Sequence, residues 1–256
     1  MGENEAFFEM IKEWTVNDYY TQSIKSEVII DTLISGFIEE MVAARFNNVK
    51  IGDVKLLAKE FPIRINDNNK QNAKVDYLVK VGNTIYLVEL KTTNKSLDDA
   101  QKERMKTLKH KVEIRDEKWD LGKFFIDVIE CQKNKSAAQK KYFFTRNYMK
   151  EKLQVNSDEE IKAILKELKV DIMYICLRRD DESEKFFNNE KIEHFYLEDF
   201  LEKIENETTE ETAERERFNS WLEEQGRENN WNKKKAWNKL KVILKEVVDV
   251  AKNFED

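Results

Sequence analysis

The chain has 256 residues and a formal net charge of −6, with 45 basic and 51 acidic side chains. Its six glycines and single proline exclude collagen-like and Pro/Gly-rich disordered proteins, which need far more of both residues. Two cysteines exclude a disulfide scaffold and favour a reduced, cytoplasmic protein. The length suits one large domain or two small ones, and the mild acidity leaves room for a local basic groove.

No apolar run approaches the ~20 residues that a membrane span needs, and the acidic segment 1–5 lacks the layout of a signal peptide. We therefore expect no membrane contact. His110 and His194 are the only histidines, so neither a zinc site nor a His-based catalytic triad is expected.

The first half of the chain changes from helical to strand periodicity. Apolar spacing predicts a short helix over residues 5–14 and a longer one over 23–46 with one buried face. An early strand is expected over 61–65, with Pro62 at its start, where a missing hydrogen-bond donor does least harm.

The strongest local signal is a β-hairpin. Residues 75–81 and 84–91 are rich in Val, Ile, Tyr and Leu, and Gly82-Asn83 between them suits a two-residue loop. Farther along, Ser96 with Asp99 resembles the capping box of a helix. The later expected elements are helices to about residue 169, a buried strand at 170–177, an edge strand at 194–196, a helix at 197–204 and a charged helical tail ending in 240–254. This order predicts an α/β fold with a helical appendage.

The hairpin brings charged residues together. If Gly82 and Asn83 form the loop, Asp76 lies directly opposite Glu89, with Cβ atoms roughly 5 Å apart. Lys91 follows Glu89 by two residues and projects from the same face. Both faces of the hairpin are otherwise apolar, and charged groups in such a place are rare unless they are paired or bound to metal. Paired carboxylates suit Mg²⁺.

The preceding helix adds one more acid. Glu27 falls near the middle of the apolar stripe of the helix predicted over 23–46, and Asp31, one turn later, is its substitute. A structural role for Glu27, partly buried, remains open. An ordinary cross-strand ion-pair cluster likewise remains an alternative for the hairpin charges, because short motifs often match by chance. The triplet Glu167-Leu168-Lys169 is identical to Glu89-Leu90-Lys91 but has no opposed acid on a hairpin partner.

These residues resemble a known superfamily. Val75-Asp76, twelve intervening residues and Glu89-Leu90-Lys91, preceded by a helix that carries Glu27, look like the PD-(D/E)XK nucleases, the restriction-endonuclease-like phosphodiesterases. The resemblance covers about residues 23–105 and the strand at 170–177. Valine stands here where the proline that names the motif is found.

The match is partial in one further place. Some branches of the superfamily carry a Gln followed four residues later by Tyr, whereas here Gln101 is followed by Met105. A role for Gln101 rests only on that partial match.

The resemblance implies a restriction-endonuclease-like core and metal-assisted hydrolysis of phosphodiester bonds. Asp76, Glu89 and the Leu90 carbonyl would bind Mg²⁺ or Mn²⁺. Lys91 would position or help to deprotonate the attacking water and stabilise the charged transition state. Glu27 would support a second metal or the water network.

Two segments could contact nucleic acid. Lys140, Lys141, Tyr142 and Arg146 mix cations with an aromatic ring, which suits nucleic-acid binding, although an ordinary amphipathic helix explains them equally well. The second segment is Lys233-Lys234-Lys235 with Trp231 and Trp237, which could bind phosphates. The apolar residues of this C-terminal tail instead favour packing against the core or a homodimer through the C-terminal helices.

We therefore expect a nuclease-like domain over residues 1–204, with a helical insertion at about 115–168, and a helical C-terminal extension over 205–256. The expected function is that of a cytoplasmic, Mg²⁺- or Mn²⁺-dependent nuclease, favouring a DNA endonuclease of restriction, repair or defence. The alternatives are a catalytically inactive nucleic-acid-binding or assembly module with the same fold, and an unrelated α/β protein with an incidental charge cluster.

Overall fold

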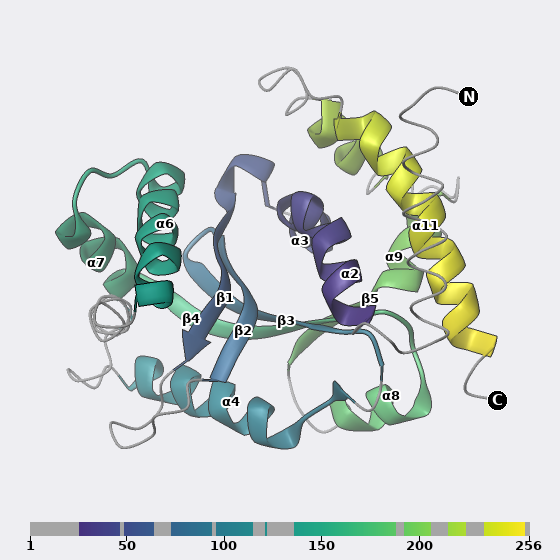
Figure 1. Ribbon diagram of the computed structural model, residues 1–256, viewed down its shortest axis with the longest axis horizontal. Coiled ribbons are helices and arrows are strands. Elements are labelled where there is room, and N and C mark those ends of the chain that lie inside the picture. The colour runs from purple at the N-terminus through teal and green to yellow at the C-terminus, as the bar shows by residue number, and fades with distance from the viewer. Residues whose placement is uncertain are drawn as a thin grey trace. The chain divides into compact units, whose positions relative to one another are not determined.

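A computed structural model describes residues 26–46, 49–63, 73–93, 96–114, 121, 136–187, 192–205, 215–223 and 233–253. The helix predicted over residues 5–14 lies outside the described residues. The predicted α/β class is confirmed, because the chain contains both helices and strands. The five strands form one sheet of order β1-β2-β3-β4-β5 (Figure 1). None of the described helices combines the length and apolar character that a bilayer crossing requires.

The sheet is mixed. Strands β1 (Val54–Ile63), β2 (Ala73–Val81) and β3 (Thr84–Lys91) form an antiparallel meander. The Lys169 amide donates to the Asn83 carbonyl (3.0 Å) and the Leu177 amide to the Lys91 carbonyl (2.8 Å). The offset along the chain is the same at both ends, so β4 (Lys169–Cys176) runs parallel to β3. Strand β5 (Glu193–Tyr196) forms the other edge, and both later strands were predicted within one residue.

The predicted hairpin of β2 and β3 is confirmed, including its register. The pairs run from Val81 opposite Thr84 to Tyr77 opposite Val88. Gly82 opens the two-residue loop with a φ of +54°, in the left-handed region that favours glycine. Its amide donates to the Asp53 carbonyl (3.1 Å), which ties the loop to the start of β1.

Replacing Gly82 by alanine is expected to destabilise the protein by about 1–2 kcal/mol, because a Cβ strains a left-handed backbone. Gly52 provides a matched control, since its φ is not positive and an added Cβ meets nothing within 4 Å. Urea denaturation of Gly82→Ala and Gly52→Ala measures both effects. Equal stability of the two variants would contradict the assigned loop conformation.

Strand β1 differs from the prediction. The predicted strand began at residue 61 with Pro62 at its start, whereas β1 begins at Val54 and Pro62 is its last residue but one, opposite Lys74. The proline is tolerated there because β1 is an edge strand, which leaves one side of its backbone unpaired. A register shift between Leu56 and Ala58 breaks the alternation that would have identified the strand.

The predicted helix over residues 23–46 is divided. Two α-helices, α2 (Ser26–Ile34) and α3 (Ile38–Arg45), are joined by a 3₁₀ turn at Ser35–Phe37. The turn contains Gly36, which weakens an α-helix. The buried side of the segment includes Ile34, Phe37 and Ile38, as its apolar period indicated.

The helix after the hairpin begins later than predicted. Helix α4 (Asp99–Glu113) has Asp98 as its N-cap, and the Asp98 carboxylate accepts a hydrogen bond from the Ala100 amide (2.8 Å). The proposed capping box at Ser96 and Asp99 is therefore wrong. Ser96 instead donates its hydroxyl to the Thr93 carbonyl (2.5 Å).

Five further helices lie within the described part of the chain. Helix α8 was not predicted. The helices are α6 (Ser136–Leu153), α7 (Asp158–Glu167), α8 (Asp181–Phe187), α9 (Leu197–Lys203) and α11 (Lys233–Asn253), with a further helical segment at 215–223.

The chain divides into two compact units. The first unit contains residues 1–51, 90–97 and 175–256, and the second contains 52–89 and 98–174. The division falls inside β3, between Glu89 and Leu90, and inside β4, between Tyr174 and Ile175. The domain boundary expected after residue 204 stays a prediction.

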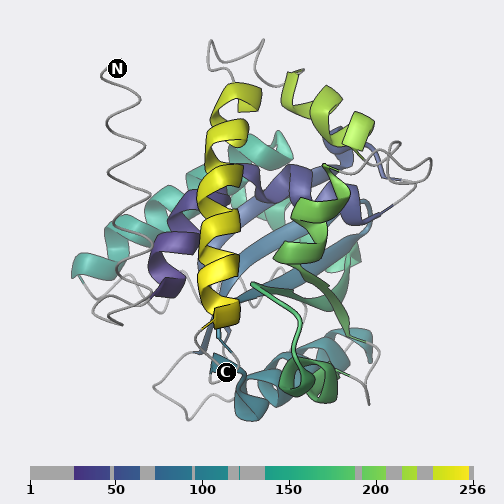
Figure 2. The same cartoon turned by 90° about the vertical axis from the view of Figure 1, so that its right-hand side faces the viewer.

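In the first unit, α11 lies alongside α9 (Figure 2). Trp237 contacts Phe37 and Phe218 edge-on, with ring centroids 5.0 and 4.9 Å apart. Leu244 and Val247 are buried, whereas Val242 is exposed. Packing within the chain therefore accounts for these two apolar residues of the tail, and a homodimer through the C-terminal helices stays a prediction.

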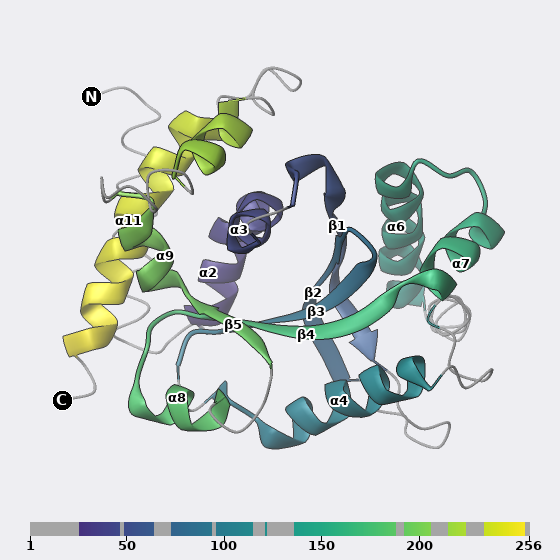
Figure 3. The same ribbon diagram turned by 180° about the vertical axis from the view of Figure 1, so that it is seen from behind.

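In the second unit, α6 packs against both α7 and β1 (Figure 3). Asp158 at the start of α7 joins the two helices through Arg146 (3.3 Å) and Lys150 (2.9 Å). Lys109 of α4 donates to Asp171 of β4 (2.8 Å), which fixes α4 to the sheet. These contacts anchor the helix that reaches the candidate site.

Candidate active site

Asp76 and Glu89 lie at the open end of the hairpin, in the second unit. The observed pairs end at Tyr77 opposite Val88. Continuing this register by one residue places Asp76 opposite Glu89, on the same face of the sheet as Leu78 and Leu87. The predicted arrangement of the two acids therefore rests on this continuation of the observed register and stays a prediction.

Burial is as expected for a functional acid in a core strand. Every residue of β3 from Ile85 to Lys91 is buried. Glu89 has an exposed fraction of 3%, and Asp76 is half-buried. Holding a carboxylate at such a position is costly unless hydrogen bonds or a cation compensate.

Gln101 supplies one of those hydrogen bonds. From the first turns of α4, its side-chain Nε2 donates to Glu89 Oε1 (2.6 Å) and to the Lys74 main-chain carbonyl (3.3 Å). It therefore bridges β2 and β3 beside the two acids and orients the Glu89 carboxylate. The structure brings Gln101 to the site although its match to the superfamily motif is partial.

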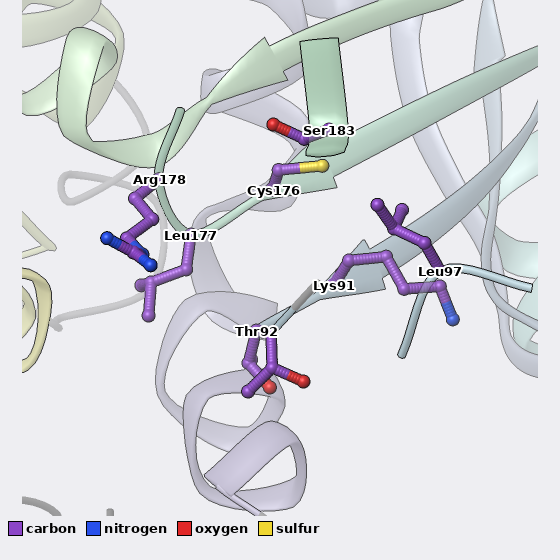
Figure 4. Close-up of a pocket in the computed structure, with 8 residues that line it drawn as sticks. Lys91, Thr92, Leu97, Cys176, Leu177, Arg178 and Ser183 are labelled. Atoms are coloured by element: carbon purple, nitrogen blue, oxygen red, sulfur yellow. The ribbon is translucent and has the colours of Figure 1, made fainter. Parts of the chain in front are cut away.

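Leu90 and Lys91 continue β3 in the first unit. Lys91 is two residues after Glu89, so it leaves the strand on the same face. Its exposed fraction is 6%. Its side chain lines a small pocket that also includes Thr92, Leu97 and Cys176 (Figure 4). Burial raises the pKa of the Cys176 thiol to about 12, which suits a small buried hydrophobe.

Two further acidic residues, Glu27 and Asp31, lie on α2. Glu27 belongs to α2, but its side chain lies outside the described part of the chain. Asp31, its substitute, is half-buried on the same helix. Both residues belong to the first unit, and their roles stay predictions.

The donor set at the hairpin fits a hard divalent cation. Asp76 and Glu89 offer carboxylate oxygens, and Mg²⁺ commonly binds through one or two carboxylates while it keeps several waters. A cation would also neutralise two like charges that otherwise destabilise adjacent strands. Across the described ranges, no three His, Cys, Asp or Glu side chains form a metal-binding group. The fit therefore rests on two carboxylates.

One acid near the site was missed. Lys59 lies opposite Tyr77 and Phe61 opposite Val75, so Glu60 occupies the position on β1 that faces Asp76. Glu60 has a φ of +47°, which is uncommon for a residue other than glycine, and its carboxylate lies 3.4 Å from Lys74 Nζ. The sequence held no signal for it, because the strand was expected to begin only at residue 61.

The predicted nucleic-acid-binding residues all fall on α6. The side chains of Lys140, Lys141 and Tyr142 lie outside the described part of the chain. Arg146 is ion-paired with Asp158 and three-quarters buried, so it already has a structural role between α6 and α7. Binding of nucleic acid by this helix stays a prediction.

The look-alike triplet has a different setting. Glu167 is the last residue of α7 and is exposed, and Lys169, also exposed, begins β4. Both charged residues of this triplet therefore lie at the surface.

Comparisons with family models, curated proteins and solved structures gave no match.

Proposed function

We propose that the chain is a metal-dependent nuclease with a restriction-endonuclease-like core, acting on DNA as an endonuclease of restriction, repair or defence. The observation that carries the proposal is the hairpin end, where Gln101 holds the buried Glu89 carboxylate and the register, continued by one residue, places Asp76 opposite Glu89. The order of helix, antiparallel meander, helix and a strand parallel to β3 supports the same core.

Each residue has a distinct role in this proposal. Asp76 and Glu89 would hold Mg²⁺ or Mn²⁺, with the Leu90 carbonyl as a further ligand. A bound divalent ion of this kind lowers the pKa of its water and stabilises negative charge on a phosphoryl oxygen. Gln101 would fix the orientation of Glu89, as outer hydrogen-bond partners do for metal ligands.

Lys91 would act on the reacting groups themselves. The Lys91 side chain projects from β3 on the same face as that of Glu89. It is buried at the end of the strand, so its position is preorganised. It would orient the attacking water and stabilise the charge that develops on the phosphate. Glu27 would support the water network or a second metal.

The proposal is tested by incubating the protein with plasmid, linear DNA and RNA in Mg²⁺, Mn²⁺ or EDTA. We expect cleavage with either metal and none in EDTA. Because Lys91 is assigned a catalytic role, Lys91→Ala should lower the rate by about 10²–10³-fold with folding unchanged. Cleavage that persists in EDTA and in Lys91→Ala would defeat the site assignment.

The second candidate is a catalytically inactive nucleic-acid-binding or assembly module. The basic residues at the carboxyl ends of β3 and β4 would allow this module to bind nucleic acid without hydrolysing it. Nucleic-acid binding by a protein that cleaves none of the three substrates in either metal would favour this candidate. The presence of Asp76, Glu89 and Lys91 in the same chain favours the nuclease over an inactive module.

A further inference from the structure

Lys74 lies at the open end of the hairpin, two residues before Asp76 on β2. Because side chains alternate along a strand, these two residues project from the same face of the sheet. The Lys74 side chain is 52% exposed, whereas Val75, on the opposite face, is fully buried. The face assigned to the metal ligands therefore also presents a solvent-accessible cation.

The backbone of Lys74 is fixed to the candidate site. Gln101 Nε2 donates to the Lys74 carbonyl (3.3 Å) and to Glu89 Oε1 (2.6 Å). One side chain of α4 thus holds both the start of β2 and the buried acid of β3. The origin of the Lys74 side chain is therefore set relative to Glu89, while its flexible four-carbon stem lets the ammonium adjust to a ligand.

The Lys74 ammonium is paired with an acid of the neighbouring strand. Glu60 Oε2 of β1 lies 3.4 Å from Lys74 Nζ, and both side chains are more than half exposed. An ion pair this exposed contributes little to stability. Exchange of the Glu60 carboxylate for another oxyanion at this ammonium therefore costs little.

The spacing along β2 suits a second phosphate of a bound DNA strand. Two residues of a β-strand span about 7 Å, and successive phosphates of one DNA strand advance by about 3.4 Å along the duplex axis. With the phosphate to be cleaved at Asp76 and Glu89, a neighbouring phosphate lies within reach of the Lys74 side chain. Lysine ammonium groups commonly contact phosphate oxygens in DNA complexes.

We propose that Lys74 binds the backbone phosphate of DNA next to the one that is cleaved, and that this phosphate replaces Glu60 at the ammonium. The inference rests on the proposed function for the place of the cleaved phosphate. Lys74 acts on affinity and alignment, because phosphate contacts fix the position of a nucleic acid without reading its sequence. Glu60 competes with the phosphate and lowers the affinity for DNA.

The test measures DNA affinity separately from cleavage. Binding of a short fluorescein-labelled DNA duplex is followed by anisotropy in EDTA at several salt concentrations. Lys74→Ala is expected to raise Kd about fivefold, because the exchange of Glu60 offsets part of the gain from a charge-assisted contact. The slope of log K against log salt should become shallower by about 1. Lys74→Arg keeps the charge and should retain the wild-type Kd and slope.

Lys59 provides a matched control with the same change of charge on the other face of the same strand pair. It is exposed on β1 opposite Tyr77, and its ammonium lies over the Tyr77 ring (5.9 Å). Lys59→Ala should leave Kd and the salt slope near the wild-type values. Circular dichroism checks that both alanine variants are folded.

Glu60→Gln should change the affinity in the opposite direction. The amide keeps the size of the side chain but no longer competes for the Lys74 ammonium as a charged group. Its effect is limited to that of an exposed ion pair, so Kd should fall about threefold. The same anisotropy titration measures this change.

The outcomes separate this inference from the proposed function. A wild-type Kd for Lys74→Ala, equal losses in the Lys74 and Lys59 variants, or weaker binding by Glu60→Gln would overturn the phosphate contact even if the protein cleaves DNA. A selective loss in Lys74→Ala without hydrolysis by the wild type would support the contact and defeat the nuclease. Absence of DNA binding by the wild type would overturn both.

Discussion

Glu89→Gln is expected to lower the rate of Mg²⁺-dependent DNA cleavage by at least about 10³-fold, since a bound metal supplies several kcal/mol of transition-state stabilisation. The substitution keeps the shape of the side chain and an oxygen that can accept the hydrogen bond from Gln101 Nε2. It removes the negative charge that the cation requires. Plasmid nicking under single-turnover conditions measures the effect.

Thermal unfolding provides a second readout that does not depend on activity. A ligand that binds only the folded state raises Tm, so Mg²⁺ should raise the Tm of the wild type and leave that of Glu89→Gln unchanged. In EDTA the variant should be at least as stable as the wild type, because it removes repulsion from Asp76. Mg²⁺ is therefore expected to change the Tm of the wild type and not that of Glu89→Gln.

Two further variants test the specificity of this result. Glu167→Gln changes the exposed look-alike triplet and should leave both activity and the Mg²⁺ response intact. Gln101→Ala removes only the partner that orients Glu89, so a smaller loss of about 10–100-fold is expected. A Mg²⁺-dependent rise in Tm that survives in Glu89→Gln would show that the ion binds elsewhere.

Lys233→Ala should cause the largest loss of stability, about 3–5 kcal/mol, because it leaves a buried carboxylate without its charge partner. Lys233 of α11 donates to Glu40 Oε1 of α3. Glu40 is completely buried, and its Oε2 accepts no hydrogen bond from the described residues. Chemical denaturation of the wild type and the variant measures the difference.

The loss should depend on pH. Burial raises the pKa of Glu40 above its ordinary value of 4.5, and Lys233 opposes that rise. Removing Lys233 raises the pKa of Glu40 further. A carboxyl with a raised pKa in the folded state contributes stability below its unfolded pKa and loses that contribution as pH increases through the folded value. The difference in the free energy of unfolding between Lys233→Ala and the wild type should therefore become smaller as pH falls toward 4.5.

The neighbouring Lys234 offers a control. It pairs with Glu223 at an exposed position, where removal of one partner costs at most about 1 kcal/mol. Replacing both Lys233 and Glu40 by apolar residues of similar volume should restore most of the stability. Equal effects of Lys233→Ala and Lys234→Ala would contradict the structural role of the buried pair.

Local pattern explains why the hairpin could be predicted. The loop has two residues and the side-chain period is two, so the position of Gly82 fixes which residues of β2 and β3 face each other. Asp76 opposite Glu89 follows from that register alone. Strand β1 was placed too late because the register shift near Leu57 interrupts its alternation.

The remaining features depend on contacts between distant segments. Neither the hydrogen bond from Gln101 to Glu89 nor the partner of Lys233, 193 residues away, follows from spacing along the chain. The placement of Arg178 beside the end of β3 also requires the parallel pairing of β3 with β4.

The sequence by itself determined the α/β class and the hairpin with its register, because backbone conformation and alternation act over a few residues. Only the tertiary structure decided which helix residue reaches Glu89, where β1 begins, and which residues lie side by side at the ends of β3 and β4. These depend on packing between elements, and the same local pattern is compatible with many such packings.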